Sequence, residues 1–298
     1  MKIISSPNSS PLNQVTTEKI DKPVEKASKR EESVIAPANT VQDKMKAMFV
    51  KVGIKPAMTM HDYKSRKSVV DRRRDILASN KIANLQSILN FALATSVTES
   101  DTDTLDPDWF FAFTSLAENI YSQAMQELWG RIFAAEVVKP GSFSLRSLET
   151  LKALTQRDAR LFTRAVSMAS LRAGDPVPRI LVGYHQRRGL STLLRKVHPH
   201  QLNLSAHGLS YPDLLALNDM KLLYASEIES GELQPGNTVQ WRCGSSSFTI
   251  TANRKGVALV YYKFTAVGAE LAKLITRQDQ PHYLAAVKQI LMPFFTIQ

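Results

Sequence analysis

The stretch from Leu116 to Phe162, LAENIYSQAMQELWGRIFAAEVVKPGSFSLRSLETLKALTQRDARLF, combines more helix, cap and turn signals than any other part of this 298-residue chain. Apolar residues recur in it at steps of three to four, which predicts helices with one buried face. The Pro140-Gly141 pair predicts a helix end, because Gly readily adopts the left-handed conformation found there. We expect short antiparallel helices packed around Trp109 and Trp129.

Two cap signals predict where helices begin. Asp106 followed by Pro107 is typical of an N-cap and a first helical residue, since a carboxylate accepts unpaired amide protons and Pro has none to leave unpaired. Thr155 with Asp158 three residues later is a short-armed capping box. It predicts a helix that continues to about Arg172.

Two runs in this stretch, MQELWGRIFAAE (125–136) and PGSFSLRSLETLK (140–152), resemble the core of an uncharacterised bacterial domain-of-unknown-function family. A weaker similarity lies in FTAVGAELAKL (264–274). No activity and no catalytic residue is assigned to that family. The resemblance therefore implies a bacterial, cytoplasmic protein and transfers no site.

Composition divides the chain into four segments. Residues 1–40 are rich in Ser, Pro, Asn, Thr, Lys and Glu without apolar periodicity, which predicts a disordered tail. Residues 41–175 are predicted to form a helical domain. Residues 176–208 are interpreted as an irregular basic linker or insertion, and residues 209–298 as a smaller α+β domain. The predicted fold class is mainly α with this α+β domain at the C-terminus.

Within these segments, we expect a short helix over 41–52 and a long helix over 61–94, with a break near Ser79 and Asn80. A short strand is expected over 180–184. Further along, alternating apolar residues and turn residues predict three strands, over 239–243, 248–252 and 257–264. Helices before and after these strands complete an order that resembles a winged-helix module, an analogy of fold alone.

The composition excludes several classes of protein. A single cysteine, Cys243, excludes an internal disulfide framework and fits a reducing compartment. No run of 18 apolar residues occurs, so we expect no membrane-spanning helix. The N-terminal residues lack an apolar core of signal-peptide length, which favours a cytoplasmic location. The sequence predicts no oligomeric state.

The positive charge is concentrated in two regions. The net charge is +11, but residues 51–100 contain nine Lys and Arg against four Asp and Glu, and residues 151–200 contain ten against two. Residues 101–150, which include Trp129, are acidic, with three against eight. The excess is therefore not a uniform solubility coat.

The candidate binding residues come from these two basic regions. Arg157, Arg160 and Arg164 have the i, i+3, i+7 spacing of one helix face, and Lys152 lies just before them. With the second group, Arg72–Arg74, they are predicted to neutralise phosphates in a sequence-independent contact. The alternative is a solvated charged face without a ligand. Nothing in the sequence supports base-specific recognition.

Catalytic signatures are absent from the sequence. It contains neither the phosphate-binding GxxxxGK loop nor the dinucleotide-binding GxGxxG loop. Glu118, Glu127 and Glu136 lie in predicted helices, but the di-metal pattern needs Glu-x-x-His motifs, and none occurs.

Histidine and cysteine add no signature. His198, His200 and His207 have no cysteine partner nearby and are interpreted as surface loop residues. Cys243 falls in a predicted strand without a base placed by a motif, which favours a structural thiol.

The sequence therefore favours a nonenzymatic interaction or regulatory protein with no cofactor, whose partner is nucleic acid, another polyanion or a protein. The alternative is a hydrolase-like enzyme whose site is assembled without a recognisable motif.

Overall fold

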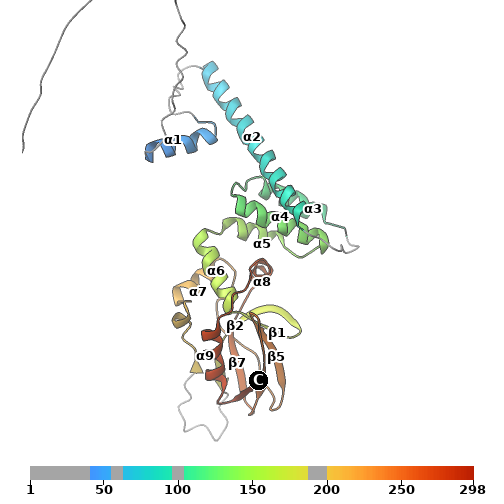
Figure 1. Ribbon diagram of the computed structural model, residues 1–298, viewed down its shortest axis with the longest axis vertical. Helices are drawn as coiled ribbons and strands as arrows, with labels where there is room; N and C mark the ends of the chain where they lie inside the picture. The colour runs from blue at the N-terminus through green and yellow to red at the C-terminus, as the bar shows by residue number, and fades with distance from the viewer. Residues whose placement is uncertain (1–40, 55–62, 96–103, 187–199) are drawn as a thin grey trace, which may run out of the picture.

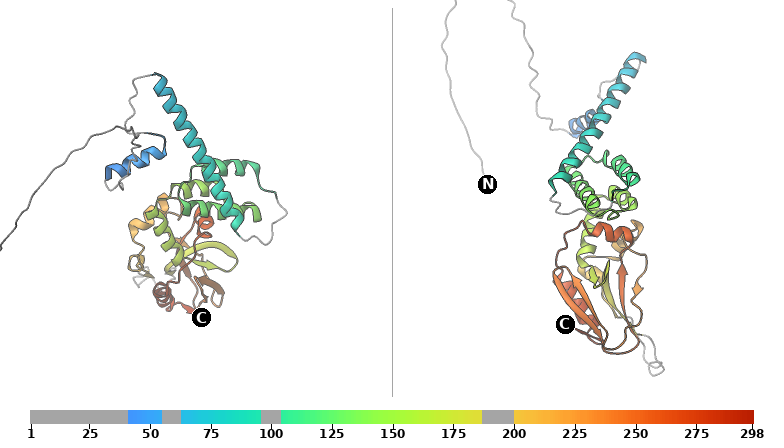
Figure 2. Two further views of the ribbon diagram at one scale, coloured as in Figure 1. Left: turned by 45° about the horizontal axis from the view of Figure 1, so that its top comes forward. Right: turned by 90° about the vertical axis from the view of Figure 1, so that its right-hand side faces the viewer.

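The computed structural model describes residues 41–54, 63–95, 104–186 and 200–298. The tail predicted over residues 1–40 lies outside this range. A layer of helices lies against one end of an antiparallel β-sheet, and the sheet belongs to the C-terminal part of the chain (Figures 1 and 2). This arrangement confirms a mainly helical fold with an α+β C-terminal region.

Six helices come before the first strand in the described part of the chain. They are α1 (Val41–Lys51), α2 (Tyr63–Ala94), α3 (Pro107–Ala117), α4 (Gln123–Val138), α5 (Leu145–Ala153) and α6 (Gln156–Met168). α2 runs unbroken through Ser79 and Asn80, so the predicted break is wrong. Ser and Asn are weak helix formers, but neither removes a backbone hydrogen bond as Pro does.

The predicted caps are confirmed. The Asp106 carboxylate accepts a hydrogen bond from the Asp108 backbone N–H at 2.9 Å, with Pro107 as the first helical residue of α3. Thr155 and Asp158 form a reciprocal capping box at the start of α6. Because such caps satisfy amide protons that the first helical turn leaves unpaired, they begin both helices at the predicted residues.

The helical layer packs around the two predicted tryptophans. Trp129 is fully buried, and its ring centroid lies 5.3 Å from that of Phe113. Trp109 stacks on Phe113 at 5.1 Å and donates a hydrogen bond from Nε1 to the Phe143 carbonyl at 2.7 Å. The aromatic residues thus join α3 and α4 to the turn before α5.

The sheet is formed by eight strands within the described residues. The strands are β1 (Ser170–Arg172), β2 (Asp175–Gln186), β3 (His200–Gln201), β4 (Ile228–Glu229), β5 (Thr238–Cys243), β6 (Ser246–Ala252), β7 (Val257–Lys263) and β8 (Phe295–Ile297). Their order is β4-β7-β2-β1-β5-β6-β8, and β3 pairs with β2. A 3₁₀ helix (Leu204–His207), α7 (Tyr211–Asp219), α8 (Ala266–Ala272) and α9 (Pro281–Leu291) complete the fold.

Two sequence predictions near the first strands are wrong. The helix expected to reach Arg172 ends at Met168, and residues 170–172 form β1, which pairs with β2 and β5. Residues 176–186, interpreted as part of an irregular linker, belong to the central strand β2, which includes the short strand expected over 180–184. Residues 178–184 are all buried, so they lack the alternation that marks a strand with one solvated face.

The predicted winged-helix module is not confirmed, because its strands belong to a sheet with further strands. β5, β6 and β7 form as expected, but β5 pairs with β1 and β7 pairs with β2. The three strands therefore belong to a sheet that begins before residue 176. Residues 187–199 of the predicted linker lie outside the described range. The boundaries of the predicted domains stay a prediction.

The helical layer and the C-terminal part of the chain meet where α5 contacts α8, a helix that also contacts β2. The Glu270 carboxylate accepts hydrogen bonds from the Ser144 backbone N–H at 2.7 Å and from the hydroxyls of Ser144 and Ser147 at 2.9 and 2.7 Å. Lys273 Nζ donates to the Ser142 carbonyl at 3.3 Å. Runs 140–152 and 264–274, which carry the family resemblance, are therefore in direct contact.

Candidate nucleic-acid interface

The N-terminal half of α2 extends beyond α3 and α4 (Figures 1 and 2). The turn that follows α1 lies against it, since Gly53 is buried next to Arg73. Among residues 66–83, whose side chains the structure describes, none is buried, and the first buried residue of α2 is Asn84. These 18 residues correspond to about 27 Å of helix. The exposed basic side chains in this segment are Arg66, Lys67, Arg72, Arg73 and Arg74.

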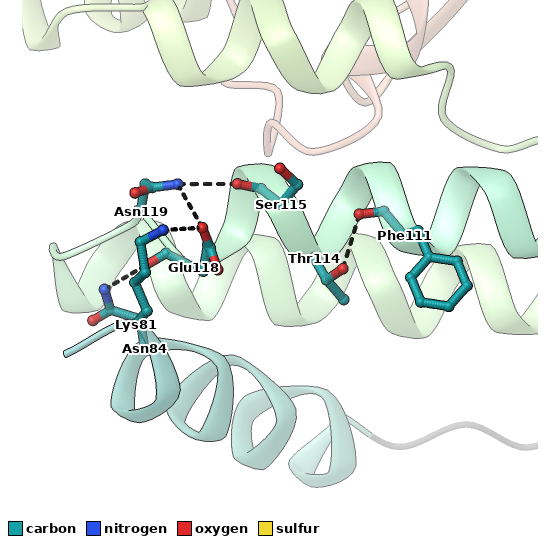
Figure 3. Close-up of polar contacts among 7 residues, drawn as sticks. All are labelled: Lys81, Asn84, Phe111, Thr114, Ser115, Glu118 and Asn119. Atoms are coloured by element: carbon teal, nitrogen blue, oxygen red, sulfur yellow. Dashed lines mark hydrogen bonds and ion pairs between the residues drawn. The ribbon is translucent and has the colours of Figure 1, made fainter. Parts of the chain in front are cut away.

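A polar network holds the base of this segment. Lys81 Nζ forms an ion pair with the Glu118 carboxylate at the end of α3, and Asn84 Nδ2 donates to the Glu118 carbonyl at 2.9 Å (Figure 3). Gln126 of α4 donates to Asn84 Oδ1 at 3.0 Å and accepts from Ser87 Oγ at 2.8 Å. These contacts fix the direction in which α2 leaves the helical layer.

The close packing of α2 on α4 depends on Gly130, in the WGR part of the 125–136 run. A Cβ atom at this position would lie 2.7 Å from Phe91 Cβ and 2.9 Å from both the Ile88 carbonyl oxygen and the Ala92 nitrogen. Two of these atoms belong to the backbone of α2, so the helices can approach this closely only without a side chain at residue 130.

Acidic side chains lie among the cations of α2. Arg74 forms an ion pair with Asp71 at 3.2 Å, whereas Lys67 and Arg72 line a surface groove together with Asp71 and Asp75. Exposed pairs of this kind contribute little stability. The side chains of Lys67, Arg72 and Arg73 are exposed to solvent.

The second predicted basic group lies on α5 and α6. All four side chains of this group, called the α6 group below, are exposed, as the spacing predicts: Lys152, Arg157, Arg160 and Arg164. However, Arg164 Nη1 donates to the Gly208 carbonyl at 2.6 Å. A hydrogen bond from Ser210 lowers the pKa of Asp213, and the charges of Arg164 and Arg157 lower it as well.

These contacts show that part of the α6 group links α6 to α7. The two predicted basic groups also lie on different parts of the molecule. The projecting half of α2 is at one end, whereas α6 connects the helical layer to the sheet (Figure 1).

The three helical glutamates do not converge on one site. Glu118 contacts Lys81, and Glu127 is exposed on α4. Glu136 is buried and accepts hydrogen bonds from the backbone N–H groups of Gly141 and Phe143 at 2.6 and 2.8 Å. Glu136 thus stabilises the turn between α4 and α5.

Replacing Glu136 with Gln tests this structural role. One acceptor oxygen becomes an NH₂ group facing a backbone N–H, so we expect the free energy of unfolding to fall by roughly 1 to 2 kcal/mol. Glu127→Gln on the same helix, at an exposed position, is the control and should change it by less than about 0.5 kcal/mol. Chemical denaturation measures both, and equal stabilities would contradict the structural role.

The other reactive side chains also occupy separate positions. Burial raises the pKa of the Cys243 thiol, which lies 3.9 Å from the Met168 carbonyl. His207 packs edge-on against Tyr283 with ring centroids 5.8 Å apart. His198 and the side chain of His200 lie outside the described range. Among the side chains that the structure describes, no three His, Cys, Asp or Glu residues are grouped so that they could hold a metal ion.

Sequence reasoning missed a groove at the β1–β2 turn, which lies next to β5 and β6. Its lining includes Arg172 and Arg242, which are 70 residues apart in the chain. The basic region 151–200 contains Arg172 but gives no sign of its partner strand. No local signal could have found this groove.

None of the helices described by the structure has both the length and the apolar character needed to cross a membrane.

The comparisons with known proteins give one match. The model of a family described as "Protein of unknown function (DUF2806)" matches residues 69–288, from α2 to α9. No curated protein and no solved structure matches the chain. The matched segment includes both runs that carry the resemblance and also Arg72, Arg73 and Arg74. Because the match covers well over half of the 298 residues, the chain belongs to the DUF2806 family.

Proposed function

We propose that this chain is a nonenzymatic interaction or regulatory protein of the bacterial cytoplasm that binds nucleic acid without sequence preference. The projecting half of α2 is its main contact surface. The α6 group, Lys152, Arg157, Arg160 and Arg164, is a secondary one. One observation supports this most directly: the exposed cations of residues 66–74 lie on a helical segment with no buried residue.

The N-terminal half of α2 lacks a buried apolar face. A helix in a globular protein is usually stabilised by packing one apolar face, but residues 66–83 have none buried. Lys and Arg that contact phosphates displace condensed counterions, and this release favours binding regardless of sequence. A solvated helix rich in Arg is suited to such a contact, because guanidinium groups bind phosphate oxygens in bidentate geometry.

The α6 group is the weaker surface for a structural reason. Arg164 is held by the Gly208 carbonyl, and the Asp213 carboxylate partly neutralises Arg157 and Arg164. Binding a phosphate there would compete with contacts that join α6 to α7. The exposed positions of Lys152 and Arg160 leave these two side chains accessible.

The experiment compares two triple variants with the same change of charge. In Arg72→Gln/Arg73→Gln/Arg74→Gln, binding to labelled duplex and single-stranded DNA and RNA should weaken for all sequences. The slope of log K against log salt should flatten by up to about 2.7, since three phosphate contacts are lost. The matched variant is Arg157→Gln/Arg160→Gln/Arg164→Gln, for which we expect a smaller loss of affinity. Titrations at two salt concentrations measure both.

The folded state should survive the α2 substitutions, because changes at exposed sites usually stay within about 0.5 kcal/mol each. A thermal melt of each variant provides this control. If the wild-type protein does not bind at low salt, or if the α2 variant binds as tightly as the wild type, the proposal is wrong. A role in protein interaction would then be the better explanation of the exposed helix.

A further inference from the structure

Apolar side chains form a stripe on the exposed side of the C-terminal half of α2. Ile82, Leu89 and Leu93 are 70%, 42% and 75% exposed, and Leu85 lies partly buried between them. Steps of three and four residues place all four on one side of the helix, and they are called the α2 stripe below. The side that faces α4 is closely packed around Gly130. This half of α2 therefore has two apolar sides, and the described residues leave the stripe side largely uncovered.

The helix around the α2 stripe is nearly free of charge. Residues 78–93, which contain the stripe, include one charged residue, Lys81, and it forms an ion pair with Glu118. Residues 66–75 of the same helix include seven. The solvated side of a surface helix usually carries charged residues. Exposed Ile and Leu without charges among them are instead typical of the core of a protein–protein interface. The α2 stripe is therefore suited to an apolar partner helix.

The α2 stripe is complementary to itself in antiparallel orientation. With a twofold axis between residues 85 and 86, Ile82 of one copy faces Leu89 of the other, because both are equally far from the axis. Leu93 likewise faces Ala78, which is exposed. The step of seven residues from Ile82 to Leu89 is that of a coiled-coil seam. A closed dimer of this kind uses the same surface on both copies.

Charge also favours the antiparallel orientation. In a parallel pair, the cations of residues 66–74 would lie side by side in the two copies and repel each other. In the antiparallel pair these segments lie at opposite ends, with their centres about 45 Å apart at about 1.5 Å of rise per residue. This separation is several times the Debye length of about 8 Å at physiological salt, so the repulsion is screened.

The area of the contact is sufficient for a dimer of moderate strength. Residues 78–93 form a strip about 24 Å long and about 10 Å wide on each copy. Two such strips bury on the order of 1,000 Å² of accessible surface in total, which is the lower limit for a specific interface. We propose that two copies of the chain form a twofold-symmetric dimer through their α2 stripes, packed as an antiparallel helix pair. The proposal does not rest on nucleic-acid binding, because Arg72, Arg73 and Arg74 lie outside residues 78–93.

The first test measures the mass of the full chain by analytical ultracentrifugation as a function of concentration. The wild type should be mostly dimeric at about 100 μM, since interfaces of moderate size reach micromolar affinity. Ile82→Lys/Leu93→Lys should raise the dimer Kd about a hundredfold or more, because it places two unpaired ammonium groups per copy in an apolar contact. The matched control is Leu215→Lys/Met292→Lys, which replaces two exposed apolar residues outside α2 and should leave the Kd within about twofold.

The second test uses disulfide cross-linking to identify the orientation of the pair. In Ile82→Cys/Leu89→Cys, mild oxidation should give a covalent dimer, because these two positions face each other in the antiparallel pair. They are about 10.5 Å apart along one helix, which is too far for a disulfide within one chain. Each single variant should cross-link far less, since its thiol lies at about the same distance from its own copy. The native Cys243 is buried and does not compete.

Circular dichroism checks the fold of each variant, and Leu93→Lys alone tests the dimer if the double Lys variant does not fold. The proposal is overturned if the wild type is monomeric at about 100 μM, a concentration at which an interface of this area should form. It is also overturned if the control pair weakens the dimer as much as the stripe substitutions, or if Ile82→Cys alone cross-links as readily as the double Cys variant.

Discussion

Truncation of Trp129 to Ala is expected to lower the free energy of unfolding by about 3 to 5 kcal/mol. The side chain is fully buried between the helices, where it packs against Phe113 with ring centroids 5.3 Å apart. Its Nε1 atom forms no hydrogen bond with the described residues, so the substitution removes packing alone. The loss combines the transfer free energy of the indole ring with the cost of the cavity that remains.

Phe111→Ala is the control for this prediction. Phe111 is also an aromatic residue of the helical layer, but its side chain is 70% exposed. Its truncation should change the free energy of unfolding by less than about 1 kcal/mol, since little apolar surface is lost from the core. Denaturant unfolding followed by circular dichroism measures both variants. Equal effects would mean that Trp129 is not the centre of the helical core.

A single added methyl group should also be strongly destabilising at Gly268, by about 3 kcal/mol. In α8, a Cβ atom at this position would lie 2.1 Å from the Leu222 carbonyl oxygen and 3.0 Å from its carbonyl carbon. Both are backbone atoms, so α8 or the segment at Leu222 would have to move, and overpacking of this kind costs about 1 to 3 kcal/mol or more. Helix propensity alone predicts the opposite sign, because Ala is favoured over Gly by about 1 kcal/mol.

The opposite signs make Gly268→Ala a clear test of the close approach. Ala266→Ser provides the control, since it adds one heavy atom at an exposed position of the same helix. Its effect on the free energy of unfolding should be within about 0.5 kcal/mol. If thermal unfolding shows that Gly268→Ala is as stable as the wild type or more stable, the contact between α8 and Leu222 is not as close as the structure shows.

Gly130 and Gly268 lie in the runs that resemble the family, 125–136 and 264–274. Gly130 brings α4 close to α2, and Gly268 brings α8 close to Leu222. Glu270, two residues after Gly268, holds the start of α5. The resembling runs therefore contain residues that join separate elements.

Local signals in the sequence were sufficient for the ends of several helices and for part of the sheet. Asp106 with Pro107 and Thr155 with Asp158 begin α3 and α6 as predicted, because a cap acts within three residues of itself. The alternation of apolar residues in β5 likewise predicts the strand, since one of its faces is buried and the other is exposed. The basic residues of α2 and α6 were also identified from sequence, and all of them are exposed.

Tertiary structure alone decided how these elements are combined and which charges are already engaged. β2 is buried on both faces, so its residues show no alternation, and its neighbours β1 and β7 are separated by more than 80 residues of chain. The helical spacing predicts Arg160 and Arg164 on the same face, but only the fold brings the Gly208 carbonyl to the Arg164 guanidinium group. Arg172 lies opposite Trp241, 69 residues further along the chain, because β1 pairs with β5. Helix capping and apolar periodicity act over a few residues, so the sequence by itself determined many of the helices and strands. Strand pairing depends on residues far apart in the chain, so only the tertiary structure decided which side chains lie next to one another.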